Sequence, residues 1–260
     1  MISIRDLSVT YRSRNRVVPA VTDLSLDIPR GKITALVGES GGGKSSLVYA
    51  ILGLLPPEAD FSGSIISEGL DIVTATEERV REFRWKKAAL VTQGAMNSLT
   101  PVITVGDQIA EVLQVRMGAG RQDALKRAGE LLEMTGLSSG FARRYPHELS
   151  GGQKQRAVIA MAVSCSPHFL LADEPTSALD VITQAEVIVT LSGMVREKGM
   201  GLLMVTHDLP LAASLCDTLA VMHRGRIVET GSPGSILGSP SHPHTRELLS
   251  AYSLIGGLGR

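Results

Sequence analysis

Apolar and polar residues alternate through the N-terminal part of the chain, which is the pattern of strands with one buried face. The stretches "ISIRDLSVTY" and "AVTDLSLDIPRG" both alternate in this way, and the second ends in a Pro/Gly turn. A third stretch, "FSGSIISEGLDI", is typical of a short hairpin. Together these segments predict an N-terminal antiparallel β subdomain.

Other segments are predominantly apolar and predict buried strands. They are residues 33–38, 87–93, 168–174 and 201–208. Helical patterns cover residues 181–199 and 209–216, and residues 217–231 predict a hairpin that turns at Arg224-Gly225.

From about Thr104 to Cys165 the apolar residues recur every three or four positions, which is the period of a helix. The helical patterns cover residues 103–115, 121–136 and 152–165, and Gly136 is a C-cap candidate. This order predicts an α/β fold, in which an inserted helical lobe interrupts a parallel-sheet core. The predicted divisions are a core of residues 1–93 and 166–235, a lobe of residues 94–165 and a short C-terminal tail of residues 236–260.

Composition narrows the classes of function. The 26 basic and 26 acidic residues cancel, and only 3% of residues are aromatic, so neither charge nor base stacking favours nucleic acid as a partner. The N-terminus lacks the apolar core of a signal peptide, and no apolar run reaches the roughly 20 residues of a membrane span. Cys165 and Cys216 are isolated and are expected to be reduced core residues. These observations favour a cytosolic protein.

The stretch "VGESGGGKSSL" places flexible residues directly between a predicted strand and a predicted helix. Gly38, Gly43, Lys44 and Ser45 match G-x-x-x-x-G-K-[ST], the loop that cradles phosphates. The backbone N–H groups of such a loop and the positive end of the helix both favour an anion. Lys44 is therefore a candidate for contact with the terminal phosphates, and the Ser45 hydroxyl for contact with Mg²⁺.

Two carboxylates, Asp173 and Glu174, stand where a buried strand is predicted to end. Ligands of α/β sheets gather at the carboxyl ends of strands, where the phosphate loop also begins. Because adjacent strand residues point to opposite faces, the two carboxylates are expected to have different roles. Asp173 fits the carboxylate that holds Mg²⁺ in P-loop proteins, and Glu174 fits a general base for an attacking water.

A second glycine-rich turn, "LSGGQKQR", precedes another apolar-striped helix. Ser150, Gly151 and Gly152 would again present N–H groups at a positive helix end. A serine N-cap with glycines is the plainer interpretation of the same residues. Two anion cradles in one chain are explained if the second one closes over a nucleotide that another chain holds.

Together these segments resemble one family, the ATP-binding subunits of ATP-binding-cassette (ABC) transporters. The resemblance rests on "GESGGGKS", "VTQGAMNSLTP", "LSGGQKQR", "LLADEPTSALD" and "LLMVTHD", in that order and over most of the chain. It implies a P-loop NTPase fold, ATP hydrolysis with Mg²⁺ and the pairing of two nucleotide-binding subunits.

The resemblance implies a role in nucleotide binding for residues of two loops and one strand. Those on the bound ATP are Tyr11, which would stack on adenine, and Gly38, Ser40, Gly41, Gly42, Gly43, Lys44, Ser45 and Ser46. Those of the signature loop, which would cap the γ-phosphate of the opposite subunit's ATP, are Ser150, Gly151, Gly152 and Gln153.

The resemblance also implies the catalytic set. Glu174 would be the catalytic glutamate, His207 the switch histidine near the γ-phosphate, and Gln93 the loop glutamine that contacts Mg²⁺ and the attacking water. Ser45, Gln93 and Asp173 would hold Mg²⁺ with the nucleotide. Residues 177–180 would join the two subunits.

Finer features resemble the importers of peptides and nickel, namely "QGAMNSLTP", "ADEPTSALDV" and the tail "GSPSHPHTRELLSAY". This implies two membrane permease subunits, a second ATPase subunit, an extracellular solute-binding protein, and a peripheral place on the cytoplasmic face of the membrane. The chain lacks the cysteine-rich segment that follows "HPHTRELL" in many peptide importers. This difference slightly favours the branch that imports nickel or metal chelates. The tail is expected to be exposed, and its His242 and His244 are not expected to form a metal site, since structural sites need about four ligands.

Three other classes of protein predict different sequence features. A permease-free ABC ATPase acting on nucleic acid or ribosomes predicts coiled-coil insertions or two cassettes in one chain, and the sequence has neither. A small-molecule kinase does not need "LSGGQ". A nucleotide-binding scaffold that never hydrolyses does not need Glu174.

Overall fold

The computed structural model describes four stretches of the chain: residues 1–13, 16–94, 98–177 and 179–256. They fold into two compact units. Unit 1 contains Met1–Val80 and Gly201–Arg260, and unit 2 contains Arg81–Met200. The predicted helical lobe, residues 94–165, falls within unit 2, and its boundaries stay a prediction.

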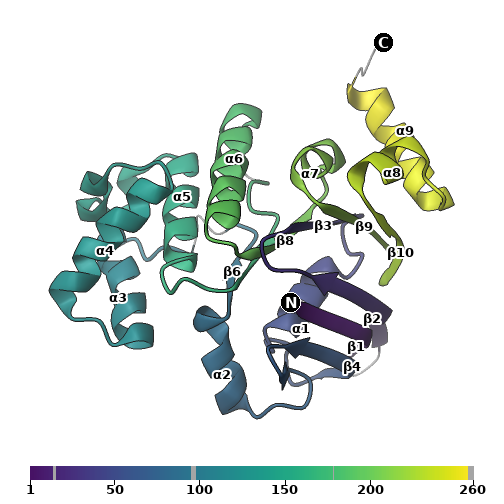
Figure 1. Ribbon diagram of the computed structural model, residues 1–260, viewed down its shortest axis with the longest axis horizontal. Coiled ribbons are helices and arrows are strands. Elements are labelled where there is room, and N and C mark those ends of the chain that lie inside the picture. Colours follow the sequence, from purple (N-terminus) through teal and green to yellow (C-terminus); the bar gives the residue numbers. More distant parts are fainter. Residues whose placement is uncertain (14–15, 95–97, 178, 257–260) are drawn as a thin grey trace. The chain divides into compact units, whose positions relative to one another are not determined.

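Unit 1 contains an antiparallel sheet whose described strands have the order β2-β1-β4-β5 (Figure 1). The strands are β1 (Ile2–Ser13), β2 (Arg16–Ile28), β4 (Ala59–Ser67) and β5 (Leu70–Asp71). Alternation along β1 buries Ile2 and Ile4, but the next buried residue is Leu7, three positions further on. The pairing shifts register between Ile4 and Leu7, and Asp6 has a φ of 47°, which together mark a β-bulge. The bulge lets both halves of a long strand bury the same face.

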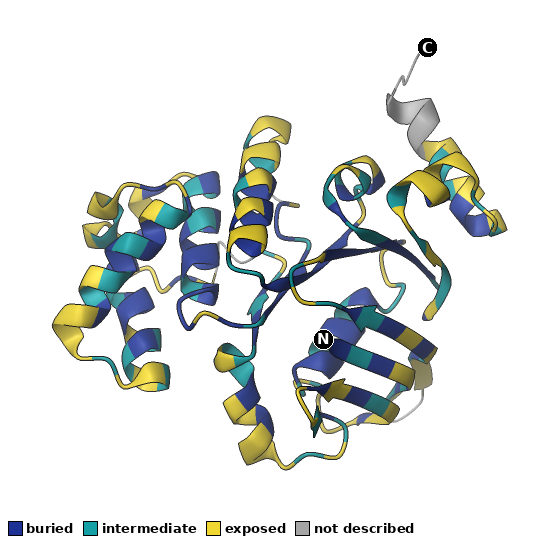
Figure 2. Ribbon diagram, in the orientation of Figure 1, coloured by how far each residue is buried: buried dark blue, intermediate teal, exposed yellow. Residues whose placement is uncertain are grey.

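The remaining described strands of unit 1 have the order β10-β9-β3-β8. They are β3 (Ile33–Gly38), β8 (Gly201–Thr206), β9 (Thr218–His223) and β10 (Arg226–Gly231). β3 runs parallel to β8 and to β9, and every residue of β3 and β8 is buried (Figure 2). β9 turns into antiparallel β10 at Arg224 and Gly225, whose φ values are 47° and 81°. The helices of unit 1 are α1 (Lys44–Ile51), α7 (Leu209–Leu215), α8 (Pro233–Gly238) and α9 (Pro243–Gly256).

Unit 2 contains the parallel strands β6 (Ala88–Val91) and β7 (Phe169–Asp173). Its helices are α3 (Val105–Met117), α4 (Arg121–Met134), α5 (Gly151–Ala162) and α6 (Val181–Glu197), with 3₁₀ helices η2 (Ser139–Arg143) and η3 (Pro146–Glu148). α2 (Glu77–Lys86) spans the boundary between the units. α4 packs against α3 and α5, and these contacts bury the apolar stripes that predicted the helices.

The predicted α/β fold is confirmed, with its parallel strands and its N-terminal antiparallel sheet. α2 was not predicted, because its sequence is mostly charged and only Val80 and Phe83 are buried in it. α8 and α9 were not predicted either. Both cysteines are buried and free, as predicted, and burial raises the pKa of Cys216 to about 11. Among the described residues, no helix combines the length and apolar character that crossing a membrane requires.

The prediction of an exposed tail is wrong for the residues that form the first turn of α9. α9 begins at Pro243, and His244 and Thr245 are only 5% and 1% exposed. Glu229 on β10 anchors this segment, because its carboxylate accepts hydrogen bonds from the backbone N–H of Ser241 (2.8 Å) and of His242 (3.1 Å). Burial opposes ionisation of Glu229, but these hydrogen bonds outweigh it and lower the pKa to about 2.

We expect the Glu229 carboxylate to stabilise the fold at neutral pH and to lose this effect in acid. Its pKa lies below the ordinary 4.5, so the stabilisation is present above pH 4.5 and is lost as the pH falls toward 2. Glu229→Gln should lower the free energy of unfolding by about 1.5–3 kcal/mol at pH 7, the range for hydrogen bonds to charged groups. Denaturant titrations at pH 7 and pH 3 measure the free energy of unfolding. The difference between the variant and the parent protein should be smaller at pH 3.

Glu58→Gln is the control, because Glu58 is an exposed carboxylate of the same unit. A Glu229→Gln protein as stable as the control at pH 7 would contradict the anchoring role.

Candidate functional site

The predicted phosphate loop connects β3 to α1 in unit 1. Gly38 ends the strand, Gly43 is the N-cap of the helix with a φ of 96°, and Gly41 has a φ of 75°. A Cβ at Gly38 would lie 2.2 Å from the Met222 carbonyl oxygen, and one at Gly43 would lie 1.9 Å from that of Ala20. A Cβ on Gly41 would meet open space. Packing therefore requires glycine at the two ends of the loop, whereas backbone conformation alone favours it in the middle.

Lys44 lies at the first position of α1 and its side chain turns back over the loop. Its Nζ donates hydrogen bonds to the carbonyl oxygens of Gly38 (2.9 Å) and Glu39 (2.7 Å), and the residue is 5% exposed. Within the part of the chain that the structure describes, no side chain caps α1. As in any helix, the first N–H groups have no intrahelical acceptor. The loop thus gathers a cation and backbone donors at a positive helix end, which is an arrangement for binding an anion.

Tyr11 and Ser46 meet at the side of this loop. The Tyr11 hydroxyl donates a hydrogen bond to Ser46 Oγ at 3.1 Å, so β1 of the antiparallel sheet is tied to the first turn of α1. His207, another predicted residue of unit 1, is exposed directly after β8. β8 and β3 are parallel neighbours, and Thr206 is paired to Val37. His207 therefore lies at the same edge of the sheet at which the phosphate loop begins.

Gln93 and Glu174 meet in unit 2. Gln93 Nε2 donates a hydrogen bond to Glu174 Oε2 at 3.0 Å, although 81 residues separate them in the sequence. β7 ends at Asp173, which is 4% exposed, and Glu174 has a φ of 46°. The prediction that strand alternation separates the two carboxylates is therefore wrong, because Glu174 lies beyond the end of the strand. A left-handed residue redirects the chain after Asp173 instead, which brings the half-buried Glu174 to Gln93.

The second predicted cradle is the N-terminus of α5. Ser150 Oγ accepts a hydrogen bond from the Gln153 N–H (3.4 Å), and Gln153 Oε1 accepts one from the Ser150 N–H (2.9 Å). This reciprocal pair is a capping box, which leaves the N–H groups of Gly151 and Gly152 as the donors without an intrahelical acceptor. A Cβ on Gly152 would lie 2.3 Å from Thr183 Cγ2 on α6, so close helix packing also requires this glycine.

Parts of two other predicted segments lie outside the described residues. These are residues 95–97, within the segment that follows Gln93, and residue 178, within the predicted subunit-joining loop. The described part of that loop includes Asp180, which caps α6 by accepting a hydrogen bond from the Thr183 N–H at 3.0 Å.

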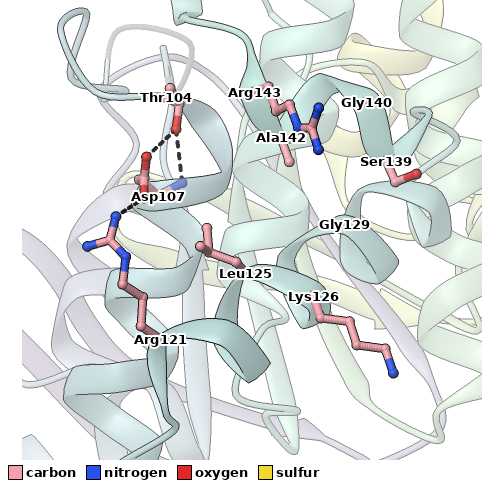
Figure 3. Close-up of a pocket in the computed structure, with 10 residues that line it drawn as sticks. All are labelled: Thr104, Asp107, Arg121, Leu125, Lys126, Gly129, Ser139, Gly140, Ala142 and Arg143. Carbon is pink, nitrogen blue, oxygen red and sulfur yellow. Dashed lines mark hydrogen bonds and ion pairs between the residues drawn. The ribbon is translucent and has the colours of Figure 1, made fainter.

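An open depression of about 730 Å³ in unit 2 was not predicted (Figure 3). Its lining includes the ion pair of Arg121 with Asp107 (3.3 Å) and two further cations, Lys126 and Arg143. Asp107 also bonds Thr104, the N-cap of α3. The cations lie on α4 and η2, and Asp107 lies on α3, so the depression is formed by three elements that sequence patterns did not bring together.

Comparisons with known proteins agree on one family. The family model described as ABC transporter matches residues 21–177. A protein of Brucella abortus, whose name provisionally designates it a peptide import ATP-binding protein, is 43% identical over 98% of this chain and 78% of its own length. The oligopeptide transport ATP-binding protein OppD of Haemophilus influenzae is 37% identical over 99% of this chain and 80% of its own length.

Solved structures give the same result for the fold. A dimeric, post-hydrolysis structure of the ATP-binding cassette MJ0796, bound to ADP and Pi, matches with a TM-score of 0.79 and 28% identity. The match covers 90% of this chain and 99% of that one.

The two ends of the phosphate loop should be more sensitive to substitution than its middle. Gly41→Ala introduces only the left-handed strain, about 1–2 kcal/mol. Gly43→Ala introduces the same strain and a contact of 1.9 Å with a backbone oxygen, so it should lose about 1–3 kcal/mol more. Denaturant unfolding of the two variants measures the difference. Equal losses would show that the loop is not held against Ala20.

Proposed function

Because the chain belongs to the ABC transporter family, we propose that it is the ATP-hydrolysing subunit of a peptide importer. The observation that carries the proposal is identity of 37–43% to proteins named for peptide or oligopeptide import, over nearly the whole chain. Import of nickel or a metal chelate, which the short tail favoured, has no comparable support. A permease-free ATPase on nucleic acid or ribosomes is the weaker alternative.

The phosphate loop would hold the β- and γ-phosphates of ATP. Gly38 and Gly43 leave no room for side chains, and Gly41 and Gly42 add none, so no side chain of these four residues would separate a phosphate from the loop backbone. Lys44 would exchange its contacts with the loop carbonyls for the phosphates, and Ser40 and Ser46 would supply further donors. Tyr11, already held beside Ser46, would stack on the adenine.

The chain also has the side chains that Mg²⁺ prefers, namely the Ser45 hydroxyl, the Gln93 amide and the Asp173 carboxylate. Bound Mg²⁺ would neutralise charge that develops on the phosphates. Glu174 would accept a proton from the attacking water as general base, and Gln93, hydrogen-bonded to that carboxylate, would orient the same water. His207 would contact the γ-phosphate as a donor and sense its presence.

The N-terminus of α5 would act on a second subunit. The capping box engages the Ser150 and Gln153 side chains within the helix end, so the N–H groups of Gly151 and Gly152 are the donors left without an acceptor inside the helix. We propose that this signature loop binds the γ-phosphate of ATP held by a partner ATPase subunit, either a second copy or a related chain. Hydrolysis would remove the group that both subunits hold, and the dimer would separate.

Transport requires membrane partners. We propose that two permease subunits dock on the described part of residues 94–114 and on the cation-lined depression beside Thr104 and Asp107. This would place the chain on the cytoplasmic face of the membrane. An extracellular solute-binding protein would deliver the peptide without touching this chain.

Glu174→Gln should separate ATP binding from hydrolysis. The substitution keeps the shape of the side chain but removes the base, so hydrolysis should fall by about 10²–10⁴-fold. With ATP and Mg²⁺ the variant should accumulate as a dimer, alone or with a related subunit, as measured by light scattering after gel filtration. Glu197→Gln, an exposed carboxylate of the same unit, is the matched control. Hydrolysis at the parent rate would show that Glu174 is not the base.

Charge reversal in the depression should weaken the membrane partnership and leave ATP hydrolysis intact. The parent protein should recover permease subunits in a pull-down from solubilised membranes. Lys126→Glu with Arg143→Glu should reduce that recovery, because both cations line the depression. Arg79→Glu reverses an exposed charge elsewhere and is the control. Recovery of nucleic-acid complexes in place of permeases would favour the alternative function.

A further inference from the structure

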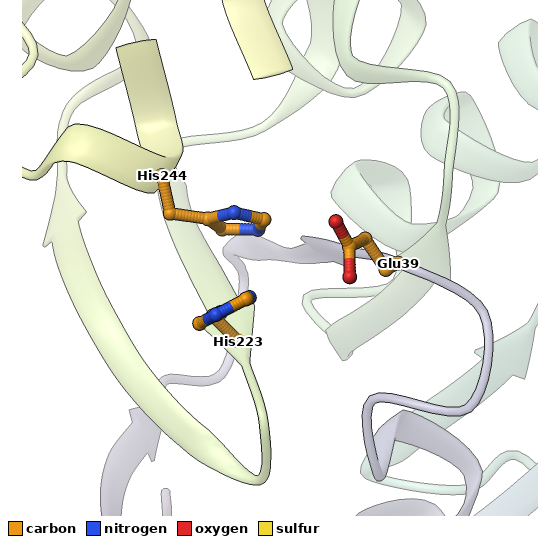
Figure 4. Close-up of side chains that lie close together, drawn as sticks. All are labelled: Glu39, His223 and His244. Atoms are coloured by element: carbon orange, nitrogen blue, oxygen red, sulfur yellow. The ribbon is translucent and has the colours of Figure 1, made fainter. Parts of the chain in front are cut away.

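Three metal-ligand side chains converge next to the phosphate loop, in unit 1. Glu39 follows Gly38 in the loop, His223 ends β9, and His244 lies in the first turn of α9 (Figure 4). One ligand atom from each lies within 4.8 Å of those from the other two. The two imidazole rings are 3.8 Å apart between centroids and tilted by 35°, and in the figure the Glu39 carboxylate lies beside them.

One nitrogen of each histidine is buried without a hydrogen-bond partner among the described residues. These atoms are His223 Nδ1 and His244 Nε2. His244 is only 5% exposed, and its Nε2 is buried, so bulk water cannot serve as the missing partner. Buried imidazole nitrogens are normally satisfied, so two such atoms at one place call for an explanation.

The remaining nitrogen of His244 lies near a carboxylate. Its Nδ1 lies 3.8 Å from Glu247 Oε2, one turn further along α9. This separation exceeds a hydrogen bond, but Glu247 is exposed, and a rotation of its side chain would place the carboxylate on Nδ1. A carboxylate in that place fixes the ring orientation and raises the basicity of the other nitrogen, as in the outer shell of histidine–metal sites. This feature is independent of the convergence of the three ligands.

We propose that Glu39, His223 and His244 bind a divalent first-row transition ion, with Zn²⁺ as the representative. Two imidazoles and one carboxylate suit Zn²⁺, Ni²⁺ or Cu²⁺, whereas Mg²⁺ and Ca²⁺ prefer oxygen ligands alone. A tetrahedral ion with bonds of about 2.1 Å needs ligand atoms roughly 3.4 Å apart, so small side-chain rotations close the site. Glu39 is exposed, so its side chain can rotate most freely of the three. A water would be the fourth ligand.

The protonation state of His223 agrees with this role. Burial lowers its pKa, and the neighbouring His244 and Arg224 lower it further, while Glu39 opposes them. The imidazole is therefore biased toward the neutral form, which is the form that binds metal.

The site connects the C-terminal helix to the phosphate loop. Glu39 is the residue whose carbonyl oxygen, with that of Gly38, accepts hydrogen bonds from Lys44. An ion held by Glu39 and α9 would favour the loop conformation in which Lys44 stays on these carbonyls. If the loop binds ATP as proposed above, the ion and the nucleotide weaken each other's binding by the same factor.

The test is calorimetric titration of the full chain, free of any histidine tag and of nucleotide, with Zn²⁺. We expect one saturable site and a rise in melting temperature with Zn²⁺, and no competition from a large excess of Mg²⁺. Glu39→Gln and His223→Gln should each weaken Zn²⁺ binding by about 10- to 100-fold or more, since losing a ligand costs at least as much as losing an outer-shell partner. Glu247→Gln should weaken it by about 10-fold.

Matched controls are available for each ligand type. Glu58→Gln and His147→Gln remove an exposed carboxylate and an exposed imidazole that are not members of the cluster, and should leave Zn²⁺ affinity unchanged. His244→Gln changes a buried residue, so Glu39→Gln and His223→Gln, at more accessible positions, decide the result if that variant fails to fold.

Absence of a saturable Zn²⁺ site would overturn the proposal. So would unchanged affinity in both Glu39→Gln and His223→Gln, or full loss of binding in His242→Gln with the three ligands intact. Because no nucleotide is present, these outcomes are independent of whether the chain hydrolyses ATP.

Discussion

The close approach of the phosphate loop to two neighbouring backbones is the constraint on which the rest of the site depends. At one end of the loop Gly38 touches the carbonyl of Met222, and at the other Gly43 touches that of Ala20. These contacts come from β9 and β2, so both sheets of unit 1 hold the loop in place. The path of the loop then determines where Lys44 enters α1 and where the N–H groups of its first turn point. A loop that were merely flexible would bind phosphate only after losing conformational entropy, whereas this one is already ordered.

Unit 2 reaches pre-organisation by a different route. Here the helix end is fixed by side chains, through the reciprocal hydrogen bonds of Ser150 and Gln153, and by the absence of a side chain at Gly152 where α6 lies close. The Gln93–Glu174 hydrogen bond fixes a carboxylate in the same way. Each group is thus held by contacts within its own unit.

Much of this could be predicted from the sequence because its signals are local. Alternation and apolar runs located the strands, glycines with a lysine and a serine at fixed spacing located the phosphate loop, and the Arg224-Gly225 pair located the hairpin turn. Local signals also have limits. They cannot show that Asp6 sits in a bulge, or that Glu174 adopts a left-handed conformation, because neither residue type requires it.

What the sequence could not predict comes from contacts between distant segments. His244 looked like part of an exposed tail because burial of α9 depends on Glu229, twelve or more residues earlier, and on the end of β9. The cation-lined depression likewise combines three elements of unit 2. α2 was missed for another reason, since only two of its residues face the core and a charged segment carries little periodicity.

The strand order of unit 1 also determines how the molecule can be assembled during synthesis. β3, which leads into the phosphate loop, lies between β8 and β9, and both of these come from the last 60 residues of the chain. While the ribosome makes the first 200 residues, β3 therefore has neither of its sheet neighbours, and unit 2 is complete before unit 1 can close. The sequence separation of these pairings makes them late and slow steps of folding. Until they form, an apolar strand has two open edges, so the segment that leads into the phosphate loop is exposed to aggregation in the nascent chain.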